Sequence, residues 1–133
     1  NEHWATKVAA KQVYDLTGVS PDEIDLFMCN DFFLASEIVS AEECGYIPRG
    51  EAWKYAIEGR TAFDGDKPIN PHGGRCNFGH AHGASGLADI VEAVKQMRGV
   101  AGATQMKNVP ETTFLRGFGG SQNVRCQILR TVA

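Results

Sequence analysis

Helix-like and strand-like apolar patterns alternate along this chain, and this alternation constrains its fold more than any other feature. Residues 4–17 carry apolar side chains at helical spacing and are followed by Gly18, which predicts a helix that ends there. The short apolar run 24–29 fits a buried strand, and a second helix is expected over 32–43. Elements that alternate in this way predict an α/β fold class.

Further helical elements follow from local signals. Residues 20–23, Ser-Pro-Asp-Glu, have the spacing of a capping box with proline at the first helical position, which predicts a short helical turn. Residues 51–58 allow another short helix. The clearest helical pattern comes later and ends at Gly99, and its apolar stripe consists of Leu87, Ile90, Val91, Val94 and Met97.

Two strands are expected at the end of the chain. Residues 112–118 and 123–131 have strand-like composition and are joined through Gly119-Gly120. Within the last of them, apolar and polar side chains alternate, as in a strand with one exposed face.

Composition narrows the class of protein. The 133 residues correspond to about one domain, and 13 Lys+Arg against 16 Asp+Glu give a net charge of −3. That balance argues against nucleic acid or an anionic membrane as the main partner, because both attract basic surfaces. No apolar run approaches the roughly 20 residues that cross a bilayer, so a soluble protein is expected. The start Asn1-Glu2-His3-Trp4 is not an initiator region, so we expect residues 1–133 to be one domain of a larger chain or complex.

The cysteines favour a cytoplasmic location, and the motifs that are absent argue against several kinds of site. Cys29, Cys44, Cys76 and Cys126 form no C-x-x-C pair, which favours reduced thiols in a cytoplasmic protein. No cysteine lies in the context of a nucleophile, and phosphate-loop and dinucleotide fingerprints are absent. Zinc-ligand chemistry does occur between residues 72 and 82, but no second ligand pair accompanies it, so no metal is expected.

Three places in the sequence are candidates for chemistry. The first is His80 with His82, in a glycine-rich segment that opens the last helix, where free backbone N–H groups suit an oxyanion; the alternative is that these histidines cap the helix or fill a polar pocket. The second is Asn30-Asp31, directly after the strand 24–29, with an ordinary helix cap as the alternative. The third is the glycine-rich segment 117–120, whose alternative is a plain hairpin turn.

Several of these segments together resemble the C-terminal half of thiolases. Asn70–Gly74 is similar to the N-x-x-G-G segment of that family, Gly79–Gly86 to its G-H-P-x-G-A-[ST]-G motif, and Glu92–Gly99 to the end of the following helix. Asn30–Phe33 looks like the N-E-A-F or H-D-x-F loop, and Gly119-Gly120 falls in the last glycine-rich loop. The resemblance covers nearly the whole chain and is closest to the branch of sterol-carrier-type thiolases and acetyl-CoA acetyltransferases.

The resemblance implies a fold and a reaction. The fold is a thiolase-like βαβαβαββ half-domain without its first strand, with a mixed sheet and helices on both faces. The reaction is Claisen condensation or thiolytic cleavage of a 3-ketoacyl-CoA in acyl-CoA and lipid metabolism. Coenzyme A thioester is then a substrate, no cofactor is bound covalently, and the nucleophilic cysteine comes from an N-terminal thiolase half outside this chain.

The resemblance also implies roles for individual residues. His80 would activate the nucleophilic cysteine and help to hold the thioester oxygen, and Asn30 would position a water that completes an oxyanion hole. Gly119, Gly120 and His82 are expected to contact the substrate. The last loop has no cysteine, which in many thiolases moves the proton on the α-carbon, and Arg116 stands there instead. Because arginine stays protonated, we expect Arg116 to bind a carboxylate on the substrate.

Two other functions remain open at this point. One is a thiolase-fold aldolase, which uses the fold without the cysteine nucleophile for retro-aldol cleavage of an acyl-CoA side chain. The other is a non-catalytic thiolase-like subunit that pairs with an active homologue or with a small OB-fold protein. By similarity to thiolases, a homo-oligomer is expected in each case.

Overall fold

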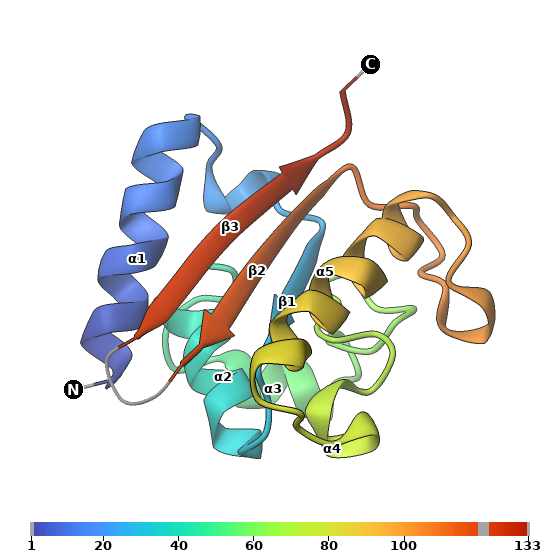
Figure 1. The fold of residues 1–133 in the computed structure, drawn as a ribbon, viewed down its shortest axis with the longest axis horizontal. Coiled ribbons are helices and arrows are strands. Elements are labelled where there is room, and N and C mark those ends of the chain that lie inside the picture. The colour runs from blue at the N-terminus through green and yellow to red at the C-terminus, as the bar shows by residue number, and fades with distance from the viewer. Residues whose placement is uncertain (1, 120–122, 133) are drawn as a thin grey trace.

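The computed structural model describes residues 2–119 and 123–132 (Figure 1). Its helices and strands alternate as predicted, with two 3₁₀ turns, η1 and η2, among them. In chain order the elements are α1 (Glu2–Thr17), η1 (Pro21–Glu23), β1 (Leu26–Cys29), α2 (Leu34–Glu43), α3 (Ala52–Ile57), α4 (Gly74–Phe78), α5 (Gly83–Met97), η2 (Gly102–Thr104), β2 (Thr112–Phe118) and β3 (Val124–Arg130).

The strands form one mixed sheet in the order β1-β2-β3. β1 runs parallel to β2, with Phe27 opposite Phe114, and β2 runs antiparallel to β3, with Phe114 opposite Ile128. A parallel pair needs a long crossover, and the chain between β1 and β2 supplies it with α2, α3, α4 and α5. The predicted α/β class and the mixed sheet are thus confirmed.

Helices pack on both faces of this sheet because successive side chains of a strand point to opposite faces. Phe27, Cys29 and Phe114 belong to a buried cluster that includes Ala10 of α1 and Ala41 of α2. On the other face, the buried side chains pack with α5 and form a second cluster of Leu26, Met28, Ala93, Met106 and Leu115. In Figure 1, α1 lies along β3 and α5 lies beside β1 and β2.

The sheet differs from the one that the family resemblance implies. A βαβαβαββ half-domain without its first strand has four strands, whereas the described residues form a sheet of three. In place of the fourth strand, the structure has a single parallel bridge between Ile69 and Phe27. Pro68 and Pro71 lack the N–H that a ladder needs, and Asn70 adopts a left-handed conformation with φ 44°, so extended pairing cannot continue.

Local predictions were correct to within a few residues, with two omissions, the 3₁₀ turn η2 and the helix α4. Ser20 N–H donates to Glu23 Oε2 over 2.8 Å, as expected of the 20–23 turn. The helix predicted over 32–43 begins later, at Leu34. Helix α4 was not predicted, because its five residues are too few for helical periodicity to show.

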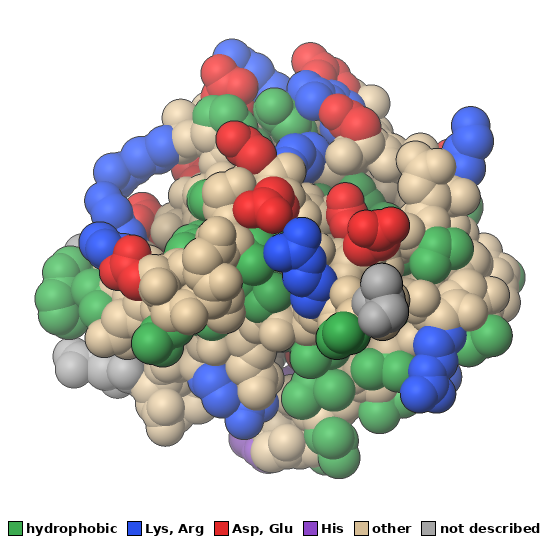
Figure 2. Space-filling view, turned by 90° about the horizontal axis from the view of Figure 1, so that it is seen from above, with side chains coloured by type: hydrophobic (Ala, Val, Ile, Leu, Met, Phe, Trp, Pro, Cys, Tyr) green, Lys and Arg blue, Asp and Glu red, His purple; other side chains and the backbone are tan. Residues whose placement is uncertain are grey.

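The surface carries both signs of charge. On the face shown in Figure 2, Lys and Arg side chains lie among Asp and Glu side chains rather than in a patch of one sign. Among the described residues, no helix is long and apolar enough to cross a bilayer.

Candidate active site

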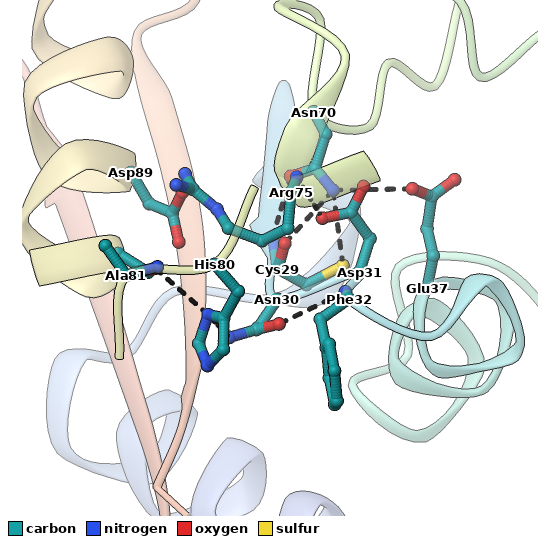
Figure 3. Close-up of polar contacts among 11 residues, drawn as sticks. Cys29, Asn30, Asp31, Phe32, Glu37, Asn70, Arg75, His80, Ala81 and Asp89 are labelled. Carbon is teal, nitrogen blue, oxygen red and sulfur yellow. Dashed lines mark hydrogen bonds and ion pairs between the residues drawn. The ribbon is translucent and has the colours of Figure 1, made fainter. Parts of the chain in front are cut away.

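Asn30 and His80 meet where β1 ends and α5 begins, although 50 positions separate them in the sequence. Asn30 is 5% exposed, and its Nδ2 lies 3.4 Å from Nδ1 of His80 (Figure 3). Strand β1 places Asn30 at the carboxyl end of the sheet, where open α/β folds bind ligands. The glycine-rich turn before α5 places His80 beside it. The two residues that the sequence analysis predicted to be catalytic thus lie in direct contact.

The hydrogen bonds around His80 orient its ring. Asn30 Oδ1 accepts from Phe32 N–H over 3.2 Å, so the amide nitrogen of Asn30 faces the ring and donates to Nδ1. Ser85 Oγ lies 3.0 Å from the same Nδ1 and accepts a bond of 3.0 Å from Ala81 N–H. These contacts favour the ring state in which Nδ1 accepts and Nε2 carries the proton. The Ser85 hydroxyl rotates and has a second lone pair, so it also supports the other tautomer.

His82 lies beside His80 and faces a pocket. The centroids of the two rings are 5.3 Å apart. The backbone of His82 has a positive φ of 45°, which residues other than glycine rarely adopt. A pocket of about 200 Å³ is lined by His82 together with Asn30, Asp89, Gly117, Gly119 and Arg125. The structure therefore brings His82 and Gly119, both expected to contact substrate, to the same pocket as Asn30. Gly120 lies outside the described residues.

Arg116 lies elsewhere. It points to the sheet face covered by α1, is 5% exposed, and donates from Nη2 to Thr6 Oγ1 over 3.0 Å. It does not line the pocket next to Asn30. Neighbouring side chains on a strand point to opposite faces, so Arg116 and Gly117 cannot face the same side of the sheet. Arg116 was expected to bind a substrate carboxylate, but the structure does not place it where it could do so in this pocket.

Asn70 holds the end of β1 in place. Its side chain accepts from Cys29 N–H over 2.9 Å and donates to Cys29 C=O over 3.0 Å, which replaces the ladder bonds that the interrupted strand does not make. The same Nδ2 lies 3.3 Å from Glu37 Oε2. Asn70 is 5% exposed, and its left-handed backbone is one that asparagine tolerates better than most residues. Asn30 is the residue after Cys29, so this pairing also fixes Asn30.

Asp31 connects the same strand end to α4. It is 2% exposed, and its Oδ1 accepts from Arg75 N–H over 2.6 Å, near the start of α4. The alternative that Asp31 caps the following helix is wrong: α2 has no side-chain cap, and Asp31 instead accepts from a backbone N–H of α4. A Cβ on Gly74 would lie 2.0 Å from Asp31 Oδ2, so only glycine fits there.

A buried ion pair then joins α4 to α5. Arg75 and Asp89 are 7% and 5% exposed, and the guanidinium of Arg75 contacts Asp89 Oδ1 directly (Figure 3). Burial raises the pKa of the Asp89 carboxyl above its ordinary value, although the charge of Arg75 acts in the opposite direction. The sequence analysis missed Asn70, Arg75 and Asp89 as site-supporting residues. Only the N-x-x-G-G motif drew attention to this region, and it pointed to a family rather than to these contacts.

Glu37 gives this network a pH dependence. Burial, followed by the charge of Asp31, raises the pKa of Glu37 to about 7 from its ordinary 4.5. Between these two values the folded protein binds more protons than the unfolded chain, so stability falls as pH rises through this window.

We therefore expect Glu37→Gln to change how stability depends on pH. The variant keeps the hydrogen-bonding shape but cannot ionise. Its free energy of unfolding should therefore increase relative to that of the wild type as pH rises from 4.5 to 7. This relative increase should be at most about 3 kcal/mol, since one pKa unit corresponds to about 1.4 kcal/mol. Urea unfolding of both proteins at pH 5 and pH 8 measures it. A constant difference at the two pH values would contradict the raised pKa.

Within residues 2–119 and 123–132, no group of three His, Cys, Asp or Glu side chains could hold a metal ion. The groups that the structure brings together at this site are a histidine, an amide and backbone N–H groups beside a pocket. Such groups stabilise an oxygen that gains negative charge, and the histidine also transfers protons.

Comparisons with known proteins agree with the resemblance seen in the sequence. A family model described as "Thiolase C-terminal domain-like" matches residues 3–130. The chain is 36% identical over 122 residues to an acetyl-CoA acetyltransferase of Methanothermobacter thermautotrophicus, covering 90% of this chain and 32% of that protein. It is 38% identical over 101 residues to sterol carrier protein 2 of Bos taurus, covering 76% of this chain and 19% of that protein.

A solved structure shares the fold. The structure "Ltp2-ChsH2(DUF35) aldolase" matches with a TM-score of 0.77 and 26% identity, over 92% of this chain and 30% of that chain. The chain thus spans about a third of the acetyltransferase and of the aldolase chain, and about a fifth of sterol carrier protein 2.

Proposed function

This chain belongs to the thiolase C-terminal domain-like family, and on that premise we propose that it is the C-terminal catalytic domain of a thiolase-type acyl-CoA acyltransferase. The reaction is Claisen condensation, or in reverse the thiolytic cleavage of a 3-ketoacyl-CoA. The observation that carries the proposal is the contact of 3.4 Å between Asn30 Nδ2 and His80 Nδ1 beside the pocket. Both residues match motif positions of the family.

His80 has two roles in this reaction. When Nδ1 accepts from Asn30 and Ser85, Nε2–H is a donor for a thioester oxygen that becomes negative. When the Ser85 hydroxyl accepts from Nδ1–H instead, Nε2 is free to take the proton of the cysteine thiol. Asn30 holds the ring and positions a water as a second donor. One donor aimed at developing charge contributes roughly 3–4 kcal/mol to catalysis.

The nucleophilic cysteine comes from outside this chain. Cys29 is the cysteine next to Asn30, but it is 1% exposed, and burial raises the pKa of its thiol well above the ordinary value. Such a thiol is a poor nucleophile. By the resemblance to thiolases, a cysteine of an N-terminal thiolase half attacks the 3-keto carbon and gives its proton to His80, the bond between C2 and C3 breaks, and C2 takes up a proton. The thiol of coenzyme A then removes the acyl group from the cysteine.

An exposed apolar groove supports the presence of that half. Phe78, Leu87 and Val91 are 65%, 63% and 47% exposed, and they line a groove of about 580 Å³ between α4 and α5. The stripe predicted on this helix therefore has two parts, since Ile90 packs inward while Leu87 and Val91 face outward. A patch of this kind marks an interaction surface, and it flanks the segment that holds His80. Homo-oligomerisation and a small OB-fold partner remain part of the proposal.

A thiolase-fold aldolase is the second candidate. Two observations favour it, namely the structural similarity to the Ltp2-ChsH2(DUF35) aldolase and the absence of a cysteine from residues 115–120. A retro-aldol reaction breaks a carbon–carbon bond without an acyl-enzyme and without free coenzyme A.

One experiment separates the two. The native assembly is purified through this chain, its polypeptides are identified by mass spectrometry, and it is incubated with a 3-ketoacyl-CoA and, separately, with a β-hydroxyacyl-CoA. Acyl transfer requires that a cysteine of the partner becomes acylated and that added coenzyme A then removes the acyl group. Cleavage of a β-hydroxyacyl-CoA without an acylated cysteine would establish the aldolase instead. An assembly that does neither would favour a non-catalytic subunit.

Replacing Asn30 tests the site independently. In the assembled protein, Asn30→Ala is expected to lower kcat by about 10²- to 10³-fold, the effect of losing one oxyanion-hole donor. KM should change little, because the lost contact forms in the transition state. Steady-state thiolysis kinetics measure both. Asn108→Ala, at an exposed position, is the matched control, and an equal loss in the two variants would exclude a specific role for Asn30.

A further inference from the structure

Arg125 places an uncompensated positive charge in the pocket beside Asn30. It comes from β3, is exposed, and lines the same pocket as Asn30 and His82. Among residues 2–119 and 123–132, its guanidinium makes no ion pair or hydrogen bond. Arg130, five positions further along the strand, instead contacts Glu23 Oε1 over 3.3 Å. The charge of Arg125 is therefore available to a ligand.

The side chain of Arg125 passes close to two glycines, Gly117 and Gly86. A Cβ on Gly86 would lie 3.5 Å from Nη2 of Arg125, and a Cβ on Gly117 would lie 4.0 Å from its Nε. The arginine thus reaches from β3 past Gly117 of β2 to Gly86 in the first turns of α5. A helix N-terminus carries a partial positive charge, so the guanidinium and α5 favour an anion at the same place.

The one carboxylate in the described lining does not neutralise this charge. Asp89 lines the pocket, but its Oδ1 is held by the guanidinium of Arg75 in a buried pair. Charges that are already paired and hydrogen-bonded attract a third group weakly. The pocket is therefore positive at the end formed by Arg125.

We propose that Arg125 binds a carboxylate on the acyl group, so that the substrates of this enzyme are acyl-CoA thioesters with a second, free carboxylate. This inference rests on the proposed acyl-transfer function. Arginine binds carboxylates through two parallel hydrogen bonds, which gives orientation as well as affinity. Asn30 lies in the wall of the same pocket, so a carboxylate bound by Arg125 would lie close to the reacting carbon.

The test compares two substrates on the assembled enzyme. One is a 3-ketoacyl-CoA with a terminal carboxylate, and the other has an uncharged methyl ester in its place. The wild type should prefer the carboxylated substrate. Arg125→Gln should lower kcat/KM for it by about 10- to 100-fold, the usual value of a charge-assisted contact, and should leave the ester nearly unchanged. Arg125→Lys should recover part of the loss, and Arg130→Gln on the same strand is the matched control.

Other outcomes overturn the inference. Equal losses for both substrates in Arg125→Gln would show that the arginine does not bind the acyl carboxylate. If those equal losses disappear with thioesters of 3′-dephospho-CoA, the anion that Arg125 binds is the 3′-phosphate of the coenzyme. An assembly without acyl transfer would refute the proposed function instead. The dissociation constants of both thioesters then test Arg125 by themselves, and equal affinities in the wild type would refute its role.

Discussion

In the assembled enzyme, His80→Ala is expected to lower kcat for thiolysis by about 10³- to 10⁴-fold, because one side chain supplies both a general base and an oxyanion donor. The base lies 3.4 Å from Asn30 Nδ2 and 3.0 Å from Ser85 Oγ, so its ring is already oriented. The loss should appear in both half-reactions, formation of the acyl-enzyme and its release by coenzyme A. Rapid-mixing measurements of each half-reaction would show this.

Asn108→Ala is the control for that loss. Asn108 is exposed and lines neither the pocket beside Asn30 nor the apolar groove between α4 and α5. Activity of this variant should stay within about threefold of the wild type, the range of most changes away from a site. If His80→Ala retained a tenth or more of the wild-type kcat, His80 would not be the catalytic histidine.

Asp89→Asn is expected to lower the free energy of unfolding of this domain by about 3–5 kcal/mol, because it leaves the buried charge of Arg75 without its partner. Arg75 and Asp89 are nearly inaccessible to solvent, and Asp31 and Gly74 hold α4 tightly against the end of β1. Water therefore cannot readily replace the lost carboxylate. Urea unfolding measures the change, and hydrogen exchange of α4 and α5 localises it to this domain.

A double variant distinguishes the charge effect from a packing effect. Arg75→Met together with Asp89→Leu removes both charges at similar volume, and such replacements are often close to neutral. The double variant should thus be more stable than Asp89→Asn alone. If it were less stable, the pair would contribute through shape and hydrogen bonds rather than through charge compensation.

The elements of this fold were predictable where a local pattern repeats over several turns or alternates along a strand. Helices α1 and α5 and strand β3 are of this kind, because burial of one face imposes a periodicity that the sequence must carry. Helix α4 and the interruption at Ile69 were not predictable in this way. A five-residue helix has no period to detect, and its start depends on a carboxylate, Asp31, that lies 44 positions away from Arg75.

The site shows the same division between local and distant causes. His80 and Asn30 stand in motifs, so the sequence by itself determined the family, the candidate catalytic pair and the α/β class. Which arginine faces the pocket depends on the register and pleat of β2 and β3, and the sequence analysis chose Arg116 where the structure has Arg125. Only the tertiary structure decided that choice, the pairing of Arg75 with Asp89, and the support of β1 by Asn70. Each of these contacts joins segments that no local pattern relates, and each follows from the way in which helices and strands pack around a common core.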